Sequence, residues 1–243
     1  MRRIVSWFSC GAASAVATWL TLKDEPNANI VYCDTGSEHS DNKRFLRDCE
    51  KWWGKKVTVI QSVKYKNIVE VFFGTKFILS TKGAVCTGEM KKVPRFNFQR
   101  ADDVQIFGYT YEEIERYMRF RGNNYDVDIR VPLVKAKLWK NDCLAIVERA
   151  GIRLPEMYRL GYKHNNCIGC VKGGAGYWNK IRVDFPYTFS GMAEVERKIG
   201  ASVLKNGSKP LFLDELPVDA GRYERAFEPK CSLLCEDVLM ENA

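Results

Sequence analysis

Short apolar runs alternate with segments of helical spacing through residue 150 of the chain. Residues 3–8 form the first apolar run, and residues 14–22 repeat apolar side chains at the intervals of a helix. The same pattern predicts further strands over residues 29–33, 56–61 and 104–108, and further helices over residues 41–53, 111–120 and 142–150. Strands that alternate with helices pair in parallel through right-handed crossovers. The pattern therefore predicts an α/β fold built on a doubly wound parallel sheet.

The pattern changes near residue 160. Residues 161–176 are rich in Gly, Asn and Cys, a helix is predicted over residues 191–199, and residues 205–229 read as an extended loop. We therefore expect two regions, which are an α/β core over residues 1–160 and a Cys-rich C-terminal region over residues 161–243 that packs on this core.

Composition adds a preference for anionic ligands. The chain has 243 residues, is 46% hydrophobic and carries a formal net charge of +8. This charge favours nucleotides, sulfate esters or nucleic acid as partners, although a basic surface also serves solubility. No apolar run is long enough to cross a bilayer, so no membrane partner is expected. The odd count of nine cysteines argues against a secreted disulfide framework, and a cytoplasmic location is expected.

A loop of small residues separates the first predicted strand from the first predicted helix. It runs Ser9-Cys10-Gly11-Ala12-Ala13-Ser14. A helix N-terminus presents unpaired backbone N–H groups and a partial positive charge, and small side chains let a phosphate approach them. Ser9 and Ser14 add hydroxyl groups. The loop lacks the lysine of a P-loop and the three glycines of a dinucleotide fingerprint, and a plain packing turn is the alternative.

This loop resembles the pyrophosphate loop, Ser-Gly-Gly-x-Asp-Ser, of the adenine nucleotide alpha-hydrolase superfamily, whose fold is Rossmann-like. Three further stretches resemble the superfamily's phosphoadenylyl-sulfate (PAPS) reductase-like members, in phage and prophage above all. They are Asp34-Thr35-Gly36, then Cys86-Thr87-Gly88-Glu89-Met90-Lys91, then Gly108-Tyr109 with Glu113 and Arg116. Two loop positions depart from the pattern, since Cys10 replaces a glycine and Ala13 replaces the aspartate. The second departure puts ATP cleavage in doubt.

The resemblance implies an adenine nucleotide, ATP or PAPS, bound by residues 1–160. On this basis Ser9, Gly11, Ala12 and Ser14 would surround phosphate, Asp34 would face the ribose or adenine, and Lys91 and Arg116 would offset the charge of phosphate or sulfate. From the residues alone, Arg116 also suits an ion pair with Glu113 three positions earlier on a helix.

Cys167-Ile168-Gly169-Cys170 has the spacing that places two thiolates on one metal. Cys86 and Cys231 are the predicted additional ligands, and the resemblance implies a 4Fe–4S cluster. A structural zinc ion and free thiols are the alternatives. Cys231 and Cys235 are also the candidate catalytic thiols, although the tail lacks the Glu-Cys-Gly-Leu-His sequence of PAPS reductases. His164 is a further candidate ligand.

Three functions are therefore expected as alternatives. The first is sulfur transfer or reduction by a PAPS reductase-like enzyme near the cluster. The second is reduction of PAPS or adenylyl sulfate itself, with a thioredoxin-like reductant as partner. The third is non-catalytic binding of a nucleotide or nucleic acid, with structural zinc. A homodimer is a further expectation, as is the host cytoplasm if a phage encodes the chain.

Overall fold

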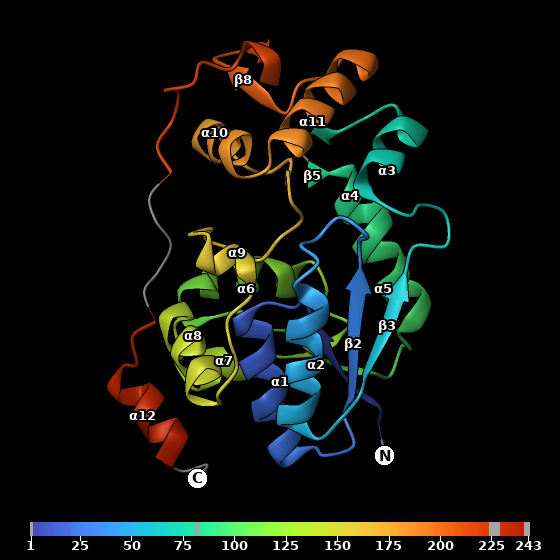
Figure 1. The fold of residues 1–243 in the computed structure, drawn as a ribbon. Coiled ribbons are helices and arrows are strands. Elements are labelled where there is room, and N and C mark those ends of the chain that lie inside the picture. Colours follow the sequence, from blue (N-terminus) through green and yellow to red (C-terminus); the bar gives the residue numbers. More distant parts are fainter. Residues whose placement is uncertain (1, 81–82, 224–228, 241–243) are drawn as a thin grey trace.

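The computed structural model describes residues 2–80, 83–223 and 229–240. Its centre is a five-stranded parallel sheet in the order β3-β2-β1-β6-β7 (Figure 1). The strands are β1 (Ile4–Phe8), β2 (Asn29–Asp34), β3 (Val57–Gln61), β6 (Val104–Ile106) and β7 (Asp128–Arg130). Helices flank this sheet, which confirms the predicted α/β class.

The order of the strands reverses beside β1. The chain runs outward from β1 to β2 and β3, then returns to the other side of β1 to form β6 and β7. Val5 in β1 is therefore aligned with Asn29 of β2 on one side and with Gln105 of β6 on the other. In open parallel sheets such a switch point leaves a crevice at the carboxyl ends of the strands, where ligands bind.

Alternate side chains of β1 point to opposite faces of the sheet. Phe8 packs with α1 (Ala12–Asp24), α2 (Asn42–Trp53) and α8 (Lys140–Arg149) in the largest core cluster. Trp7 lies on the other face and meets Phe98 of α5 (Val93–Phe98) edge to face, with ring centroids 6.0 Å apart. Four of the buried residues of α1 are alanine or valine, so this helix packs close to the sheet.

A second core lies above the carboxyl ends of the strands in Figure 1. It is formed by α3 (Ile68–Thr75), α10 (Ala175–Asp184) and α11 (Pro186–Ile199), around the fully buried Trp178. This core therefore combines residues from before and after position 160.

The predicted extended loop over residues 205–229 is corrected in its first part. Residues 204–211 form an antiparallel hairpin of β8 (Leu204–Asn206) and β9 (Lys209–Leu211), and η3 (Leu213–Glu215) follows. Buried Glu196 stabilises this arrangement, because its carboxylate accepts the backbone N–H of Val203 at 2.5 Å and of Leu213 at 2.6 Å. Residues 224–228 of the predicted loop lie outside the described residues.

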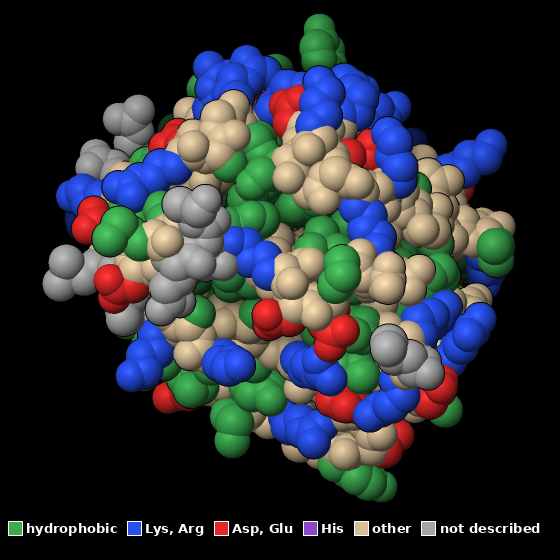
Figure 2. All heavy atoms as spheres, turned by 90° about the horizontal axis from the view of Figure 1, so that it is seen from below, with side chains coloured by type: hydrophobic (Ala, Val, Ile, Leu, Met, Phe, Trp, Pro, Cys, Tyr) green, Lys and Arg blue, Asp and Glu red, His purple; other side chains and the backbone are tan. Residues whose placement is uncertain are grey.

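The remaining elements are short or peripheral. They are β4 (Leu79–Ser80), β5 (Gly83–Ala84), α4 (Val85–Thr87), η1 (Gly88–Lys92), η2 (Tyr111–Glu113), α6 (Ile114–Gly122), α7 (Pro132–Lys135), α9 (Glu156–Arg159) and α12 (Leu233–Met240). Among the described residues, no helix is long and apolar enough to cross a membrane. Figure 2 shows Lys and Arg side chains dispersed over the lower face of the molecule and interleaved with acidic ones.

Candidate anion-binding cleft

A cleft of about 770 Å³ opens at the switch point of the sheet. The ends of β1 and β6 meet there, at Phe8 and Ser9 on one side and at Phe107 and Gly108 on the other. Of the residues predicted to bind the nucleotide, the cleft is lined by Ser9, Gly11, Ser14, Lys91 and Arg116. Ala12 and Asp34 do not line it.

Hydrogen bonds of its own serine hydroxyl groups stabilise the conformation of the loop between β1 and α1. The Ser14 hydroxyl lies 3.0 Å from both the backbone nitrogen and the hydroxyl of Ser9, and 2.9 Å from the carbonyl oxygen of Gly11. Cys10 has a φ of 54°, in the left-handed region that glycine tolerates best. A glycine at this position would adopt the same backbone conformation without strain.

The first turn of α1 points its amides toward the cleft. The helix begins at Ala12, so the N–H groups of its first residues have no partner within the helix. The amide of Ala12 is already used, because it donates, together with the amide of Asn165, to the hydroxyl of Tyr158. Burial raises the pKa of this phenol to about 12. Ala12 itself is fully buried. The amides of Ala13 and Ser14 are therefore the ones left for an anion.

Gly108 allows the end of β6 to approach this first turn. A Cβ at Gly108 would lie 2.8 Å from the Cα and 2.9 Å from the nitrogen of Ser14. These contacts are closer than carbon atoms normally come, so only glycine fits without moving the N-terminus of α1. The Gly-Tyr dipeptide of the sequence thus has a steric role at the switch point.

Cations outnumber acids among the charged side chains of the cleft. Among the residues that the structure describes, its lining includes seven lysines and arginines and two acidic residues, Glu112 and Glu113. The cationic residues are Lys91, Lys92, Arg95, Arg116, Arg119, Lys140 and Lys163. Both acids of the lining are near cations, and Glu113 forms the expected ion pair with Arg116. The remaining excess of positive charge suits an anionic ligand.

Lys91 is held at the edge of the cleft by buried Glu38. Its ammonium lies 3.3 Å from the Glu38 carboxylate, which also accepts the Tyr32 hydroxyl at 2.5 Å and the Asn42 amide at 2.9 Å. Burial opposes the charge of Lys91, but the attraction of Glu38 and of the nearby Cys167 raises its pKa above the ordinary value. Lys91 therefore stays protonated at neutral pH.

Lys140 differs from the other cations because it is buried. It begins α8, and its ammonium donates to the carbonyl of Lys163 and lies 3.1 Å from Nδ1 of His164. Burial lowers its pKa to about 8, against the attraction of Glu113 and Glu112. The contact also places His164 on the cleft lining beside Lys140.

Asp34 lies on the outer side of the sheet, away from the cleft lining. Its carboxylate accepts the backbone N–H of Gly36 and the side-chain amide of Gln61, both at 2.9 Å. Gly36 has a φ of 60°, and a Cβ there would lie 2.0 Å from the Lys66 carbonyl oxygen. The Asp-Thr-Gly segment is thus a tight turn that packs against the backbone of Lys66.

Three of the predicted metal ligands lie in one neighbourhood. Cys86 is on α4, and Cys167 and Cys170 precede α10. Burial and the proximity of Cys170 raise the pKa of Cys86, and burial raises that of Cys167 to about 12 despite nearby Lys91. The Cys167 sulfur also lies 3.1 Å from the Thr35 hydroxyl. Burial therefore disfavours the thiolate form of Cys86 and Cys167.

These thiols do not form a ready-made metal site. In the part of the chain that the structure describes, no group of three or more His, Cys, Asp and Glu side chains is placed to hold a metal ion. The geometry therefore gives the expected cluster or zinc ion no support, and both stay predictions.

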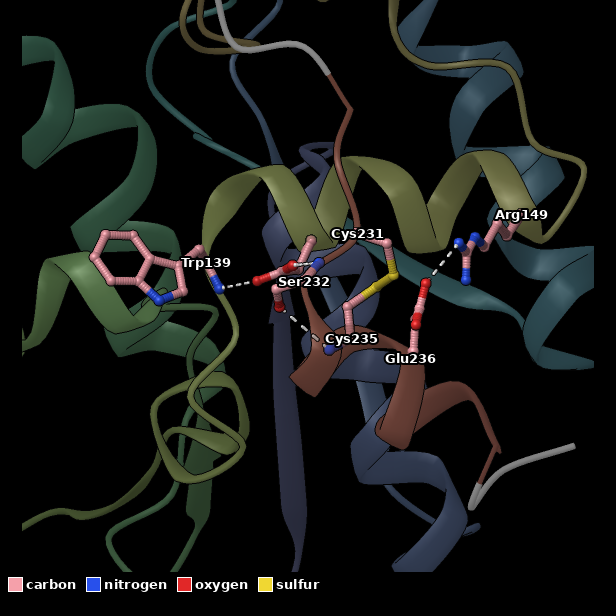
Figure 3. Close-up of a disulfide and its surroundings, with 7 residues drawn as sticks. Trp139, Arg149, Cys231, Ser232, Cys235 and Glu236 are labelled. Atoms are coloured by element: carbon pink, nitrogen blue, oxygen red, sulfur yellow. Dashed lines mark hydrogen bonds and ion pairs between the residues drawn. A yellow bond between two sulfur atoms is a disulfide. The ribbon is translucent and has the colours of Figure 1, made fainter.

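Cys231 and Cys235 are bonded to each other, away from the other predicted ligands. Their disulfide packs α12 against α8, where the backbone nitrogen of Ser232 donates to Asp142 at 2.8 Å (Figure 3). Figure 1 places α12 far from α4. In this state neither sulfur can ligate a metal or act as a nucleophile, so the structure does not bring Cys231 to Cys86, Cys167 and Cys170.

Sequence reasoning missed several residues of the cleft. Tyr158 and Asn165 lie far from the loop in sequence but contact it in space, and Asn165 donates to the Cys10 carbonyl at 2.6 Å. Lys140 lines the same cleft. Arg95 lies on a helix that was not predicted. A weak signal existed, because Lys91, Lys92 and Arg95 form a basic cluster directly after the Cys-Thr-Gly-Glu motif.

Comparison with known proteins shows a similarity to a phage protein. No protein-family model matches the chain. The chain is 26% identical, over 206 residues, to the uncharacterized nin region protein ORF290 of Escherichia phage lambda. The match covers 71% of this chain and 66% of the phage protein, so the chain spans less than two thirds of that relative's length. It is thus similar to a phage protein.

Proposed function

We propose that this protein binds a phosphate-bearing adenine nucleotide in the cleft at the switch point. The observation that carries the proposal is that the first-turn amides of α1 open into a cleft lined by seven cationic and two acidic residues. A helix N-terminus attracts phosphate through both its free N–H groups and its dipole. The preference for adenine comes from the resemblance of the loop to the pyrophosphate loops.

Sulfur chemistry is the second part of the proposal. Cys167 and Cys170 lie within electrostatic reach of Lys91, and Lys91 lines the cleft. A nucleotide whose phosphates face Lys91 would therefore place a bound sulfate near thiols. This supports a PAPS reductase-like enzyme better than PAPS reduction through Cys231 or Cys235, because those two sulfurs are bonded to each other in a disulfide at the start of α12.

A titration tests the nucleotide part. Calorimetry with ATP, PAPS, adenosine bisphosphate and adenosine is expected to give binding for the three phosphorylated compounds and none for adenosine, since the site recognises phosphate. Equal affinity for adenosine would contradict the proposal. Release of sulfite from PAPS in the presence of thioredoxin would identify PAPS reduction as the activity instead.

Anion affinity is expected to fall as the pH rises through about 8. Lys140 is charged below its pKa of about 8 and neutral above it, so between roughly pH 7 and pH 9 the cleft loses one cation. A charge-assisted hydrogen bond contributes about 1.5 kcal/mol or more, so the affinity for ATP should fall about tenfold. Titrations across this range, with Lys140→Arg beside the wild type, measure the effect.

Lys140→Arg should remove most of the pH dependence, because arginine keeps its charge. Lys56→Arg, at an exposed side chain outside the cleft, is the matched control and should behave as wild type. Stability should change in the opposite sense. The folded pKa of Lys140 is below the unfolded value of 10.5, so the stability contribution of this group grows as the pH rises from about 8. A pH-independent wild-type affinity would contradict the role of Lys140.

A further inference from the structure

Helix α6 forms one wall of the cleft although it buries none of its own residues. Arg116, Arg119 and Phe120 face the cleft, at the spacing of a single helical face. On a neighbouring face Ile114 and Met118 are 40% and 61% exposed. A helix normally owes its stability to a buried apolar face, so α6 presents apolar surface that a ligand could cover.

Among the described residues, three cations of the cleft lining have no acidic partner. They are Lys92, Arg95 and Arg119. Arg95 is the most constrained of them. Its Nε is buried without a hydrogen-bond partner, and burial lowers the pKa of its guanidinium. An unpaired guanidinium inside a cleft is costly unless an anion reaches it.

Aromatic rings surround this guanidinium. Its central carbon lies 5.0 Å from the ring centre of Phe96, 5.5 Å from that of Phe107 and 5.8 Å from that of Phe120. Phe96 is 51% exposed and does not line the cleft, so the stacking surface continues beyond the cleft mouth. Tyr125, just after α6, is 82% exposed. A ligand that uses both the cleft and this surface is longer than one nucleotide.

We propose that the α5–α6 wall, defined as Lys92, Arg95, Phe96 and Arg119, binds single-stranded nucleic acid whose end or exposed base enters the cleft. Cations that neutralise phosphates and aromatic rings on which bases stack are the two elements of single-strand recognition. A duplex hides the faces of its bases, so it cannot use Phe96 in this way. A run of acidic side chains, as in polyglutamate, supplies charge but no ring to stack on Phe96 and Arg95.

This inference deepens the proposed function by naming a polymeric partner for the same cleft. It rests on that function only for the group that enters the cleft. Lys92 ends η1, Phe96 lies on α5 and Arg119 lies on α6, so none of the three belongs to the loop between β1 and α1.

Fluorescence anisotropy with labelled single-stranded RNA and DNA of about 12 nucleotides tests the proposal. Binding should weaken steeply between about 50 mM and about 200 mM salt, and duplex DNA of the same length should bind more weakly. Arg119→Glu and Phe96→Ala should each lower the affinity about tenfold, and Arg119→Glu should also flatten the salt dependence. The matched controls are Lys205→Glu on the exposed hairpin and Phe73→Ala at a 44% exposed ring on α3, and both should bind as wild type.

Three results would overturn the proposal: no binding at low salt, equal losses in the control variants, or displacement of the oligonucleotide by polyglutamate as readily as by unlabelled strand. The two proposals fail separately. If ATP binds and no oligonucleotide does, the α5–α6 wall has another role and the nucleotide site stands. If oligonucleotides bind but neither ATP nor PAPS does, the wall stands and the nucleotide site fails.

Discussion

Gly108→Ala is expected to lower the affinity for ATP or PAPS by about tenfold to a hundredfold. The added methyl would lie 2.8 Å from the Cα of Ser14 and 3.1 Å from the carbonyl carbon of Ala13. Backbone at both ends of this contact has to move, and overpacking of this kind costs about 1–3 kcal/mol. Because the displaced atoms carry the amides that face the anion, the cost should appear in binding as well as in stability.

Calorimetric titration and urea unfolding of the same variant measure the two effects. Gly88→Ala is the matched control. A Cβ at Gly88 meets nothing within 4 Å, and its backbone is in the right-handed helical region, so alanine should fit there and leave binding unchanged. If Gly108→Ala binds nucleotide as tightly as wild type, the first turn of α1 is not the phosphate site.

Glu38→Ala is expected to destabilise the protein by about 3 kcal/mol. The Glu38 side chain is 3% exposed and receives the Tyr32 hydroxyl, the Asn42 amide and the Lys91 ammonium. Removing the carboxylate leaves these three groups without their shared acceptor. Glu38 also pairs by a β-bridge with Cys167, so the loop that carries Cys167 and Cys170 should loosen too.

Urea unfolding measures the loss, and the rate of thiol labelling at Cys167 reports on the loop. Glu38→Gln should lose less, because its amide oxygen can still accept one of the hydrogen bonds. Glu194→Ala removes the same group from an exposed pair with Lys198, and should change stability by less than about 1 kcal/mol. A Glu38→Ala protein as stable as wild type would mean that Lys91 and its neighbours find other partners.

Local pattern accounts for most of the core. The predicted strands over residues 29–33 and 56–61 are confirmed within a residue, and the predicted helix over residues 41–53 corresponds to α2. Residues 30–33 are consecutively apolar, as in a strand that is buried on both faces. In α2 the apolar residues recur every third to fourth position because one face is buried. The strand β7 was missed because it is three residues long with a single buried residue, Ile129.

The hydrophobic pattern also predicted the N-terminus of α1 two residues too late. The predicted helix began at residue 14, whereas α1 begins at Ala12 within the loop of small residues. A run of small residues has no apolar periodicity, so the sequence pattern could not locate the N-terminus of α1. The position of this N-terminus decides which backbone amides face the cleft.

The amino-acid sequence by itself determined the alternation of strands and helices, the small-residue loop after β1 and the excess of positive charge, since each depends on neighbours along the chain. Only the tertiary structure decided where distant residues meet. The return of the chain beside β1 creates the cleft. Tertiary packing also brings Tyr158 and Asn165 to the loop and separates Cys231 from Cys86, Cys167 and Cys170. The physical reason is that these contacts follow from strand order and packing between segments far apart in sequence, and no local pattern encodes either one.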